Sequence, residues 1–494
     1  MLTMGLQEQI PNELWLEIFR FLPPDALRHL SLTHNKFKGI SRPLLYKQFH
    51  FHPYASGQGD TILLPSPTEV NQTMERLDFW CSDEIAPNVR SCEITPWRMI
   101  GPVWSRWETK SLTRPPLTSS WYRYSSAWDS SPVFGNSMPM GFTSHSPEWL
   151  VYVAPSLTSL RLENCGVATG AHIDTSSMSL GVSHFLFHHI VTDAAGNGDL
   201  WIPLLCPEVP LELDITLNPR IFGDDIPSFP HVHRLSTTMN LSTMSYNLSI
   251  LSKFPAVQTF SMDGWGQWLR HEPDVLVKAS SLFPDLRQYT DPCATIALFL
   301  LRPTLTHLTI EYCSPVDLTA ELHRTLSLDL AAQLRRARGP NGITSFTASL
   351  DDLYIATLDT ICEFFPRLTE LRIDVTSYAE QYEYQDINPR ATTFFDELMD
   401  ISTLPATLER LALTWELEYD EPEEALTADF PAFDELRDAL VWRCPSIKAL
   451  WLDSHEFLFH WRRLLDGSEV EDTAEDAESS EEMRKGFTAF WDTQ

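Results

Sequence analysis

The segment A-P-S-L-T-S-L-R-L-E-N-C at residues 154–165 recurs as R-P-T-L-T-H-L-T-I-E-Y-C at residues 302–313. Two further copies are F-P-R-L-T-E-L-R-I-D-V-T at residues 365–376 and C-P-S-I-K-A-L-W-L-D-S-H at residues 444–455. Their L-x-L alternation predicts a short strand that buries one face, because successive side chains of a strand point to opposite sides. Stacking such units would bury a continuous core that no single unit could form.

Helix-like apolar segments precede many of the repeat prolines and would cover the outer side of the strands. They span residues 248–254, 274–283, 295–301, 358–365, 394–401 and 436–444. Pro207, Pro230, Pro255 and Pro284 lie 23, 25 and 29 residues apart, whereas the later copies are spaced more widely. The pattern predicts an α/β fold, and the alternative is a generic α/β domain with many strand-helix units.

The pattern P-x-L-x-x-L-x-L-x-x-C/N resembles the leucine-rich repeat, whose period is about 20–29 residues. The resemblance implies an irregular leucine-rich-repeat solenoid with a curved parallel sheet. We place a first repeat-like unit at residues 51–97 and the main repeat domain at residues 148–465.

The N-terminal segment I-P-N-E-L-W-L-E-I-F-R-F-L-P-P-D-A-L, residues 10–27, predicts two short apolar helices. Leu14, Ile18 and Leu22 recur at four-residue spacing on one helical face. Pro11 suits a helix start, and the two prolines after Leu22 end the first helix and open a second. About forty residues form too small a core to stand comfortably alone, so the unit is expected to dock on its own chain or on a partner.

This segment resembles the F-box over residues 8–50, and the resemblance implies a short N-terminal unit of three helices. The chain departs from the family pattern with Ile10 for the usual Leu, Thr33 for Val and Phe37 for Trp. The R-P-L-L-Y ending at residues 42–46, followed by a loose proline-leucine repeat, is similar to fungal F-box proteins. The resemblance implies binding of the Skp adaptor, and through it a cullin, by the following residues: Ile10, Pro11, Glu13, Leu14, Ile18, Leu22, Leu27, Leu30 and Phe37.

Charge argues against a three-helix DNA-binding unit, the other interpretation of this segment. The 494 residues include 36 Lys and Arg against 67 Asp and Glu, a net charge of −31. Such a field repels nucleic acid and anionic membrane surfaces and favours basic partners. Without a signal sequence, a long apolar stretch or any C-x-x-C among its eight cysteines, the chain is expected to be cytoplasmic or nuclear with reduced thiols.

No catalytic motif stands out in the sequence, so we expect no enzyme activity, cofactor or metal. His184 and His188 are four apart and could ligate a metal only if helical, with no Cys or carboxylate nearby to complete a site. His231 and His233 are two apart on one strand face and are likewise expected to be ordinary packed or surface histidines. Cys444 occupies a repeat position that predicts burial. A hydrolase or transferase on an α/β fold is the remaining enzyme alternative.

The solvent-facing position after the last repeat leucine is acidic in several copies. In parallel strands these residues would form an acidic ladder on the concave face, suited to a basic protein segment. Arg161 and Arg372 interrupt it, and the alternative is that exposed strand positions simply favour polar residues. The candidate target-binding residues are Glu163, Asp263, Glu311, Asp374 and Asp453.

Two segments break the repeat pattern. Residues 98–147 are rich in Ser, Pro and Trp, which predicts a flexible insertion, and the alternative is that its aromatic residues form a strip that docks a partner. Residues 466–494 begin with nine acidic and no basic residues up to Glu482, which predicts a solvated tail. Its end, G-F-T-A-F-W-D at residues 486–492, is expected to pack as a short anchor.

Together these patterns predict the substrate-recognition subunit of a Skp-cullin-F-box ubiquitin ligase, with an F-box for the adaptor and a repeat domain for a protein target. The alternative is a non-catalytic leucine-rich-repeat scaffold or binding protein whose F-box serves only interdomain packing.

Overall fold

The computed structural model describes a large part of the chain in two compact units. The described residues are 10–51, 54–56, 62–63, 67–94, 97–98, 153–163, 179–188, 201–217, 226–240, 244–265, 273–311, 330, 334, 342–350, 353–377, 388–399, 401, 403–417, 433–453, 458–474 and 477–492. The first unit holds those up to Met239 together with Ser249–Ala256, and the second holds Asn240–Leu248 and all those from Val257.

The described part of the chain begins with three short helices, α2 (Asn12–Arg20), α3 (Pro24–Thr33) and α4 (Asn35–Leu45). Pro24 takes the first position of α3, where its missing N–H costs no hydrogen bond. The His34 side chain accepts from the Lys36 backbone N–H and so caps the start of α4. Their shared core is closed by Phe19, Leu27, Phe37 and Ile40.

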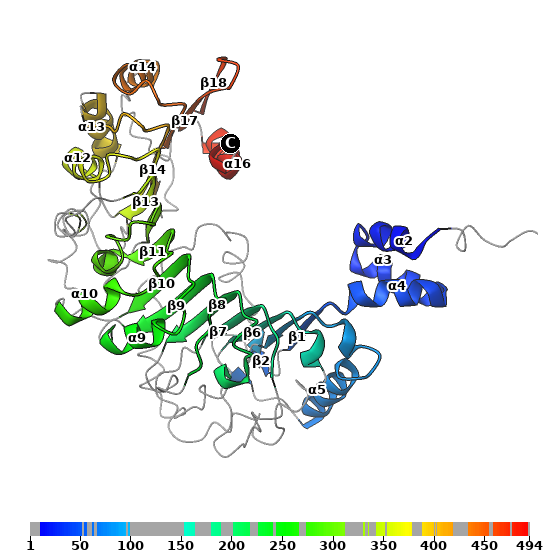
Figure 1. Cartoon of the computed structure of the whole chain (residues 1–494). Helices are drawn as coiled ribbons and strands as arrows, with labels where there is room; N and C mark the ends of the chain where they lie inside the picture. The colour runs from blue at the N-terminus through cyan, green and yellow to red at the C-terminus, as the bar shows by residue number, and fades with distance from the viewer. Residues whose placement is uncertain are drawn as a thin grey trace, which may run out of the picture. The chain divides into compact units, whose positions relative to one another are not determined.

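The first unit continues as a parallel sheet whose strands follow one another in chain order (Figure 1). One buried row runs from Phe49 through Cys92, Leu160, Phe185 and Leu213 to Leu235. The strands are β1 (Gln48–Phe51), β4 (Ser91–Ile94), β6 (Ser159–Glu163), β7 (His184–His188), β8 (Glu212–Leu217) and β9 (Arg234–Asn240).

Short elements connect or flank these strands. Helix α5 (Pro67–Trp80) precedes β4, and three 3-10 turns, η1 (Ala86–Asn88), η2 (Ala154–Ser156) and η4 (Ile202–Leu204), precede β4, β6 and β8. A separate three-stranded sheet has the order β3-β2-β5, from β2 (Tyr54–Ser56), β3 (Ile62–Leu63) and β5 (Trp97–Arg98).

The second unit repeats the same plan. Its first row of buried side chains includes Phe260, Tyr289, Leu308, Phe346 and Leu371 in register. All its strands are parallel as far as β16, and two antiparallel strands follow. The strands are β10 (Thr259–Trp265), β11 (Gln288–Pro292), β12 (His307–Glu311), β13 (Ser345–Leu350), β14 (Glu370–Ser377), β15 (Arg410–Leu417), β16 (Ala449–Asp453), β17 (Leu458–Arg463) and β18 (Glu469–Ala474).

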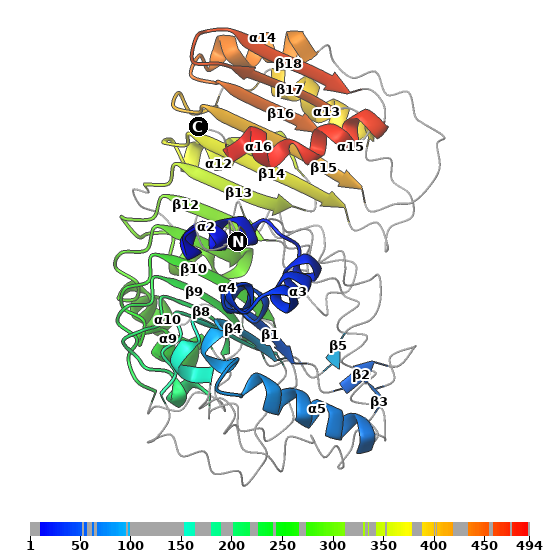
Figure 2. The same ribbon diagram turned by 90° about the vertical axis from the view of Figure 1, so that its right-hand side faces the viewer.

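Each segment predicted to be helical contains a helix or a 3-10 turn, with shifted ends. They are α9 (Met244–Leu251), α10 (Pro273–Ser280), η6 (Cys293–Leu298), α12 (Ile355–Phe364), α13 (Asn388–Met399) and α14 (Phe433–Arg443). In the second unit α12, α13 and α14 lie on one side of strands β13 to β17, whereas α15 (Ala477–Lys485) and α16 (Phe487–Asp492) lie on the other (Figures 1 and 2). We call this second side the inner face.

The hydroxyl residues of the repeat motif join each repeat to the repeat before it. In L-T-S-L and L-T-E-L, the Thr158 hydroxyl donates to the Arg90 carbonyl and the Thr369 hydroxyl to the Thr344 carbonyl. The backbone N–H groups of Thr369 and Glu370 also converge on the Thr344 carbonyl. This contact recurs between successive repeats, so the threonine supplements the strand ladder. The sequence pattern had marked the proline, the leucines and the closing Cys or Asn, but not this threonine.

The fold class is confirmed: among the described residues, three helices precede mostly parallel strands of leucine-rich-repeat type, which follow one another in chain order within each unit. The prediction of a solvated C-terminal tail is wrong in one respect. Residues 469–473 are exposed, but Glu469–Ala474 pairs with β17 as an antiparallel strand because β17 offers it an open edge. The insertion predicted at residues 98–147 falls almost wholly outside the described residues.

Leu371 tests whether the stacked rows carry the stability of the second unit. The Leu371→Ala variant should lower the free energy of unfolding by about 2–5 kcal/mol, since a fully buried leucine is removed from the middle of a row. Chemical denaturation followed by circular dichroism measures this. Leu465→Ala, at a fully exposed position, is the control and should change it by less than about 0.5 kcal/mol. Equal, small effects would contradict the stacked-core description.

Candidate protein-binding surfaces

Helix α2 presents two apolar faces. Trp15 and Phe19 turn inward, with Trp15 packing edge-on against Phe37 at a centroid distance of 5.0 Å. Leu14 and Ile18 turn outward and remain 55% and 47% exposed. Because the core is already filled by the inward face, the outward residues are not needed to hold the three helices together.

The structure divides the predicted adaptor residues into exposed and internal ones. Pro11, Glu13, Leu14 and Ile18 are exposed, whereas Ile10, Leu22 and Leu30 are half-buried and Leu27 and Phe37 are buried. Sequence reasoning missed two apolar side chains that stand almost fully in solvent, Phe21 (86%) and Leu32 (84%). Their positions beside buried residues gave no periodic signal that distinguishes outward from inward.

The three helices are tied to the first strands by side-chain contacts. Arg42 of α4 pairs with Glu84 at 2.5 Å. Tyr46, at the end of α4, packs edge-on against Phe79 and Trp80, each at 5.6 Å between centroids. These contacts couple the helical unit to the start of the sheet.

The predicted acidic ladder is partly in register. Asp374 of β14 and Asp453 of β16 both lie opposite Thr414 of β15, in one row of the inner face. Glu311 of β12 lies opposite Pro292 of β11, so neutral residues interrupt the row. Asp263 and Glu311 are half-buried. Glu163 lies at the end of β6, opposite His188.

Two histidines of the first unit each lie beside a carboxylate of a neighbouring strand. His50 lies 2.9 Å from Glu93, and His188 lies 2.8 Å from Asp214. His184 and His188 share strand β7, and four residues of strand separate them by roughly 13 Å, too far for one ion. Across the described ranges, no three His, Cys, Asp or Glu side chains are placed to share a metal.

The remaining candidates for chemistry have ordinary surroundings. The prediction that His231 and His233 share a strand face is wrong, because both precede β9; His231 pairs with Glu208 at 3.1 Å, and His233 contacts the Ala256 carbonyl. Cys444 is fully buried, as predicted, and its thiol donates to the Pro405 carbonyl at 3.2 Å.

Cys362 is likewise buried, and desolvation raises its pKa to about 12, with smaller contributions from Asp359, Cys444 and Glu363. A thiol held protonated in this way is a poor nucleophile.

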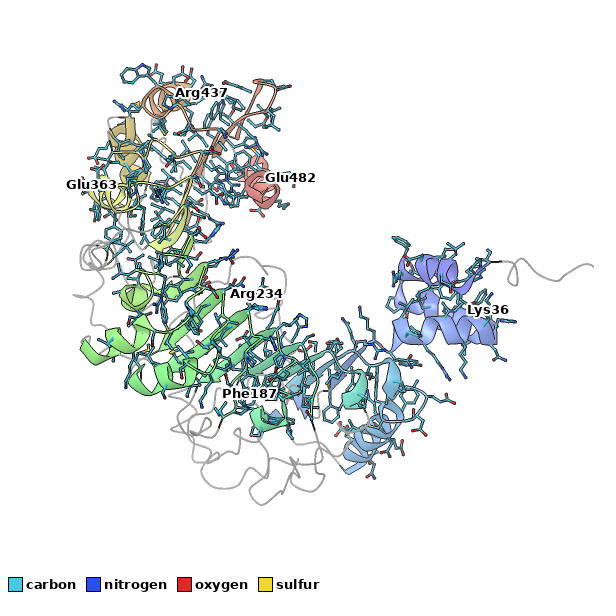
Figure 3. The ribbon with its side chains drawn as sticks, in the orientation of Figure 1. Lys36, Phe187, Arg234, Glu363, Arg437 and Glu482 are labelled. Atoms are coloured by element: carbon cyan, nitrogen blue, oxygen red, sulfur yellow. The ribbon has the colours of Figure 1, made fainter. Side chains whose placement is uncertain are left out.

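The inner face of strands β14 to β17 is covered by the C-terminal helices. Ala412, Trp451 and Leu458 form its buried floor. Figure 3 marks Glu482 on α15, on the side of the sheet away from Arg437 of α14. The predicted C-terminal anchor is thereby confirmed, and the side chains packed on the floor are Met483, Phe487, Phe490 and Trp491.

Three arginines of the sheet each lie over one aromatic ring of α16. Arg372 stands 4.6 Å from the centroid of Phe487. Arg410 lies 5.0 Å from Trp491, and Arg462 lies 5.8 Å from Phe490. These distances fall within the range of cation–π attraction.

Two of the predicted ladder residues are closed off beneath this cover. Asp453 accepts two hydrogen bonds of 2.7 Å from Arg484 of α15, and Asp374 pairs with Arg372 at 2.9 Å. Their exposure is only 2% and 8%. A basic residue does occupy the ladder at Asp453, but it comes from the same chain.

His460 lies under the edge of α16. Its ring stacks on Trp451 and contacts Phe490 at 5.0 Å, while Nε2 lies 3.0 Å from Asp472. Nδ1 is buried without a hydrogen-bond partner among the described residues. Burial lowers the pKa of His460 below its ordinary value of 6.5; Arg462 adds to this and Asp472 opposes it.

Comparison with known proteins identifies the N-terminal segment more clearly than the repeat domain. Residues 7–52 match the family model described as F-box-like, and they form an F-box-like domain. No curated protein matches the chain. The chain is similar to the crystal structure of the leucine-rich repeat-containing protein LegL7 from Legionella pneumophila, with 15% identity over 56% of this chain and 90% of that one. The TM-score is 0.29, so the fold assignment rests on the strand order and register above.

None of the described helices is long and apolar enough to cross a membrane.

The His460 pKa reports on the packing of α16. Because closure disfavours the charged imidazole, the contact is most stable above pH 6.5 and weakens as the pH falls below that value. Exchange of the imidazole C2 hydrogen, followed by mass spectrometry, measures the pKa. Phe490→Ala should raise it toward 6.5, and Leu465→Ala should leave it unchanged. A pKa unaffected by Phe490→Ala would contradict burial under α16.

Proposed function

We propose that the protein is the substrate-recognition subunit of a Skp-cullin-F-box ubiquitin ligase. The observation that carries this is the outward apolar face of α2 on an F-box-like domain whose core is already complete. Burying an aliphatic side chain of this size against a partner is worth about 1.5–3 kcal/mol. Leu14 and Ile18 would supply the centre of the contact with a Skp-family adaptor, and that adaptor would carry the cullin.

The predicted residues then have different roles. Pro11, Glu13, Leu14 and Ile18 would touch the adaptor, and Phe21 or Leu32 would extend the contact. The half-buried and buried residues of the predicted set would support these from within: Ile10, Leu22, Leu27, Leu30 and Phe37.

Target recognition falls to the repeat domain. The net charge of −31 would steer a basic protein toward it and repel nucleic acid. Glu163, Asp263 and Glu311 are the ladder residues proposed to face such a target. In this role the chain performs no catalysis itself and works in the cytoplasm or nucleus. A fungal source would agree with the R-P-L-L-Y ending of the F-box-like segment.

The competing proposal is a scaffold whose F-box-like domain serves only interdomain packing. The contacts of Arg42 with Glu84 and of Tyr46 with Phe79 and Trp80 would serve that role as well. The two proposals differ in what the outward face of α2 does. An adaptor subunit needs it, and a scaffold does not.

Charging the outward face of α2 separates them. The full-length Leu14→Glu/Ile18→Glu variant should bind a recombinant Skp-family adaptor at least ~10-fold more weakly than the native chain, because two desolvated apolar contacts become buried charges. Isothermal titration calorimetry measures this. Val277→Glu, which charges an exposed apolar residue of α10, is the control and should bind normally.

Circular dichroism should show the same thermal midpoint for all three chains, since neither Leu14 nor Ile18 fills the core. A native chain that binds no adaptor would favour the scaffold. Binding unaffected by the double substitution would show that another surface holds the adaptor.

A further inference from the structure

The segment that covers the inner face, α15 and α16, contacts it through four side chains. Its contacts come from Arg484, Phe487, Phe490 and Trp491, at steps of three, six and seven residues from the first. The basic residue meets a buried aspartate, and each ring meets an arginine. The arginines belong to three different strands, β14, β15 and β17.

This part of the inner face differs chemically from the strands before it. The equivalent middle positions of β10 to β13 are Ser261, Thr290, Thr309 and Thr347, all small hydroxyl residues. On β14 to β16 the same row becomes Arg372, Ala412 and Trp451. A large ring, a small floor residue and arginines together form a surface that fits aromatic side chains.

One contact does not depend on the side chain of the covering segment. Arg410 donates to the backbone carbonyl of Trp491 while its guanidinium also pairs with Glu370. The rings of Phe487, Phe490 and Trp491 are only half-buried. The cover therefore binds the sheet as a ligand would, through an ionic anchor, three ring contacts and a backbone hydrogen bond.

We propose that the inner face of β14 to β17 is a recognition surface for a basic-aromatic peptide segment, and that α15 and α16 occupy it in cis. The partner it fits is a segment with Arg or Lys followed by aromatic residues three, six and seven positions later. This inference rests on the proposed function, because it names the target class and the regulation of the repeat domain. Asp453 would select the basic residue, and Arg372, Arg410 and Arg462 would select the rings.

Because α15 and α16 belong to the same chain, they compete strongly with any external peptide for the inner face. A tethered segment acts at an effective concentration on the order of millimolar. If the covering segment itself has an intrinsic Kd of ~10 µM, a competing peptide would bind the closed chain ~100-fold more weakly than a chain whose inner face is uncovered. The C-terminal helices would thus exclude weak ligands and yield to matching ones.

The test uses full-length protein and a fluorescent peptide of residues 482–494. The variant that combines Phe487→Ala, Phe490→Ala and Trp491→Ala is called the open chain, because it lacks the three ring contacts. Fluorescence anisotropy should show at least ~10-fold tighter peptide binding to the open chain than to the native chain. Adding Arg410→Ala to the open chain should remove the gain. A control peptide with alanine at the three aromatic positions should bind at least ~10-fold more weakly than the native peptide.

Three results would overturn the proposal. The folded open chain could bind no peptide, which makes α15 and α16 a structural cover only. Native and open chains could bind equally, which means that the helices do not occupy the surface. The control peptide could bind as well as the native one, which removes the aromatic requirement.

A milder variant serves if the open chain fails to fold by circular dichroism. Arg484→Glu keeps every aromatic contact and places a repulsive charge beside Asp453. It too should bind the native peptide more tightly than the native chain does, and no gain would overturn the proposal. Adaptor binding, measured on the same proteins, reports separately on the proposed function.

Discussion

The structure depends on the alignment of apolar side chains from one strand to the next. A strand of five residues such as β6 buries only two leucines, far too little to offset the conformational entropy of ordering its unit. In register with its neighbours, Leu160 joins a row of buried side chains that continues on both sides. Each repeat is therefore stable only through those adjacent to it. The threonine that bonds the preceding carbonyl holds this register.

The elements that sequence could predict are those with a local signal. The alternation in S-L-R-L-E directly predicted strand β6, and the apolar runs before the prolines predicted helices such as α12 and α14. Helix ends were less accurate: α12 begins at Ile355, three residues before the predicted start. Ile355 lies three residues before Leu358, so the apolar spacing continues through the first turn, and the predicted start was three residues too late.

Elements defined by long-range contacts could not be predicted in the same way. Leu14 and Ile18 have the same spacing as Trp15 and Phe19, and only packing against Phe37 decides which pair faces inward. Strand β18 resembles an acidic tail because its residues are exposed, and its pairing with β17 depends on a free strand edge. The acidic ladder was predicted from strand alternation, but its partial closure depends on Arg484, 31 residues from Asp453.

The inner face near the C-terminus unites these observations. In a chain with net charge −31, three arginines gather there with a buried tryptophan, and aromatic residues of the same chain cover them. Helix α16 has only six residues, and an isolated helix of that length is unstable in water. Any order in α16 must therefore come from the sheet beneath it.

Hydrogen–deuterium exchange of the full-length chain measures this dependence directly. Amides of Phe487–Asp492 should exchange well below the rate of unstructured peptide, and the Phe487→Ala/Phe490→Ala/Trp491→Ala chain should lose that protection while β14 and β15 keep theirs. Native α16 amides that exchange at the unstructured rate, beside a protected sheet, would contradict the covered inner face.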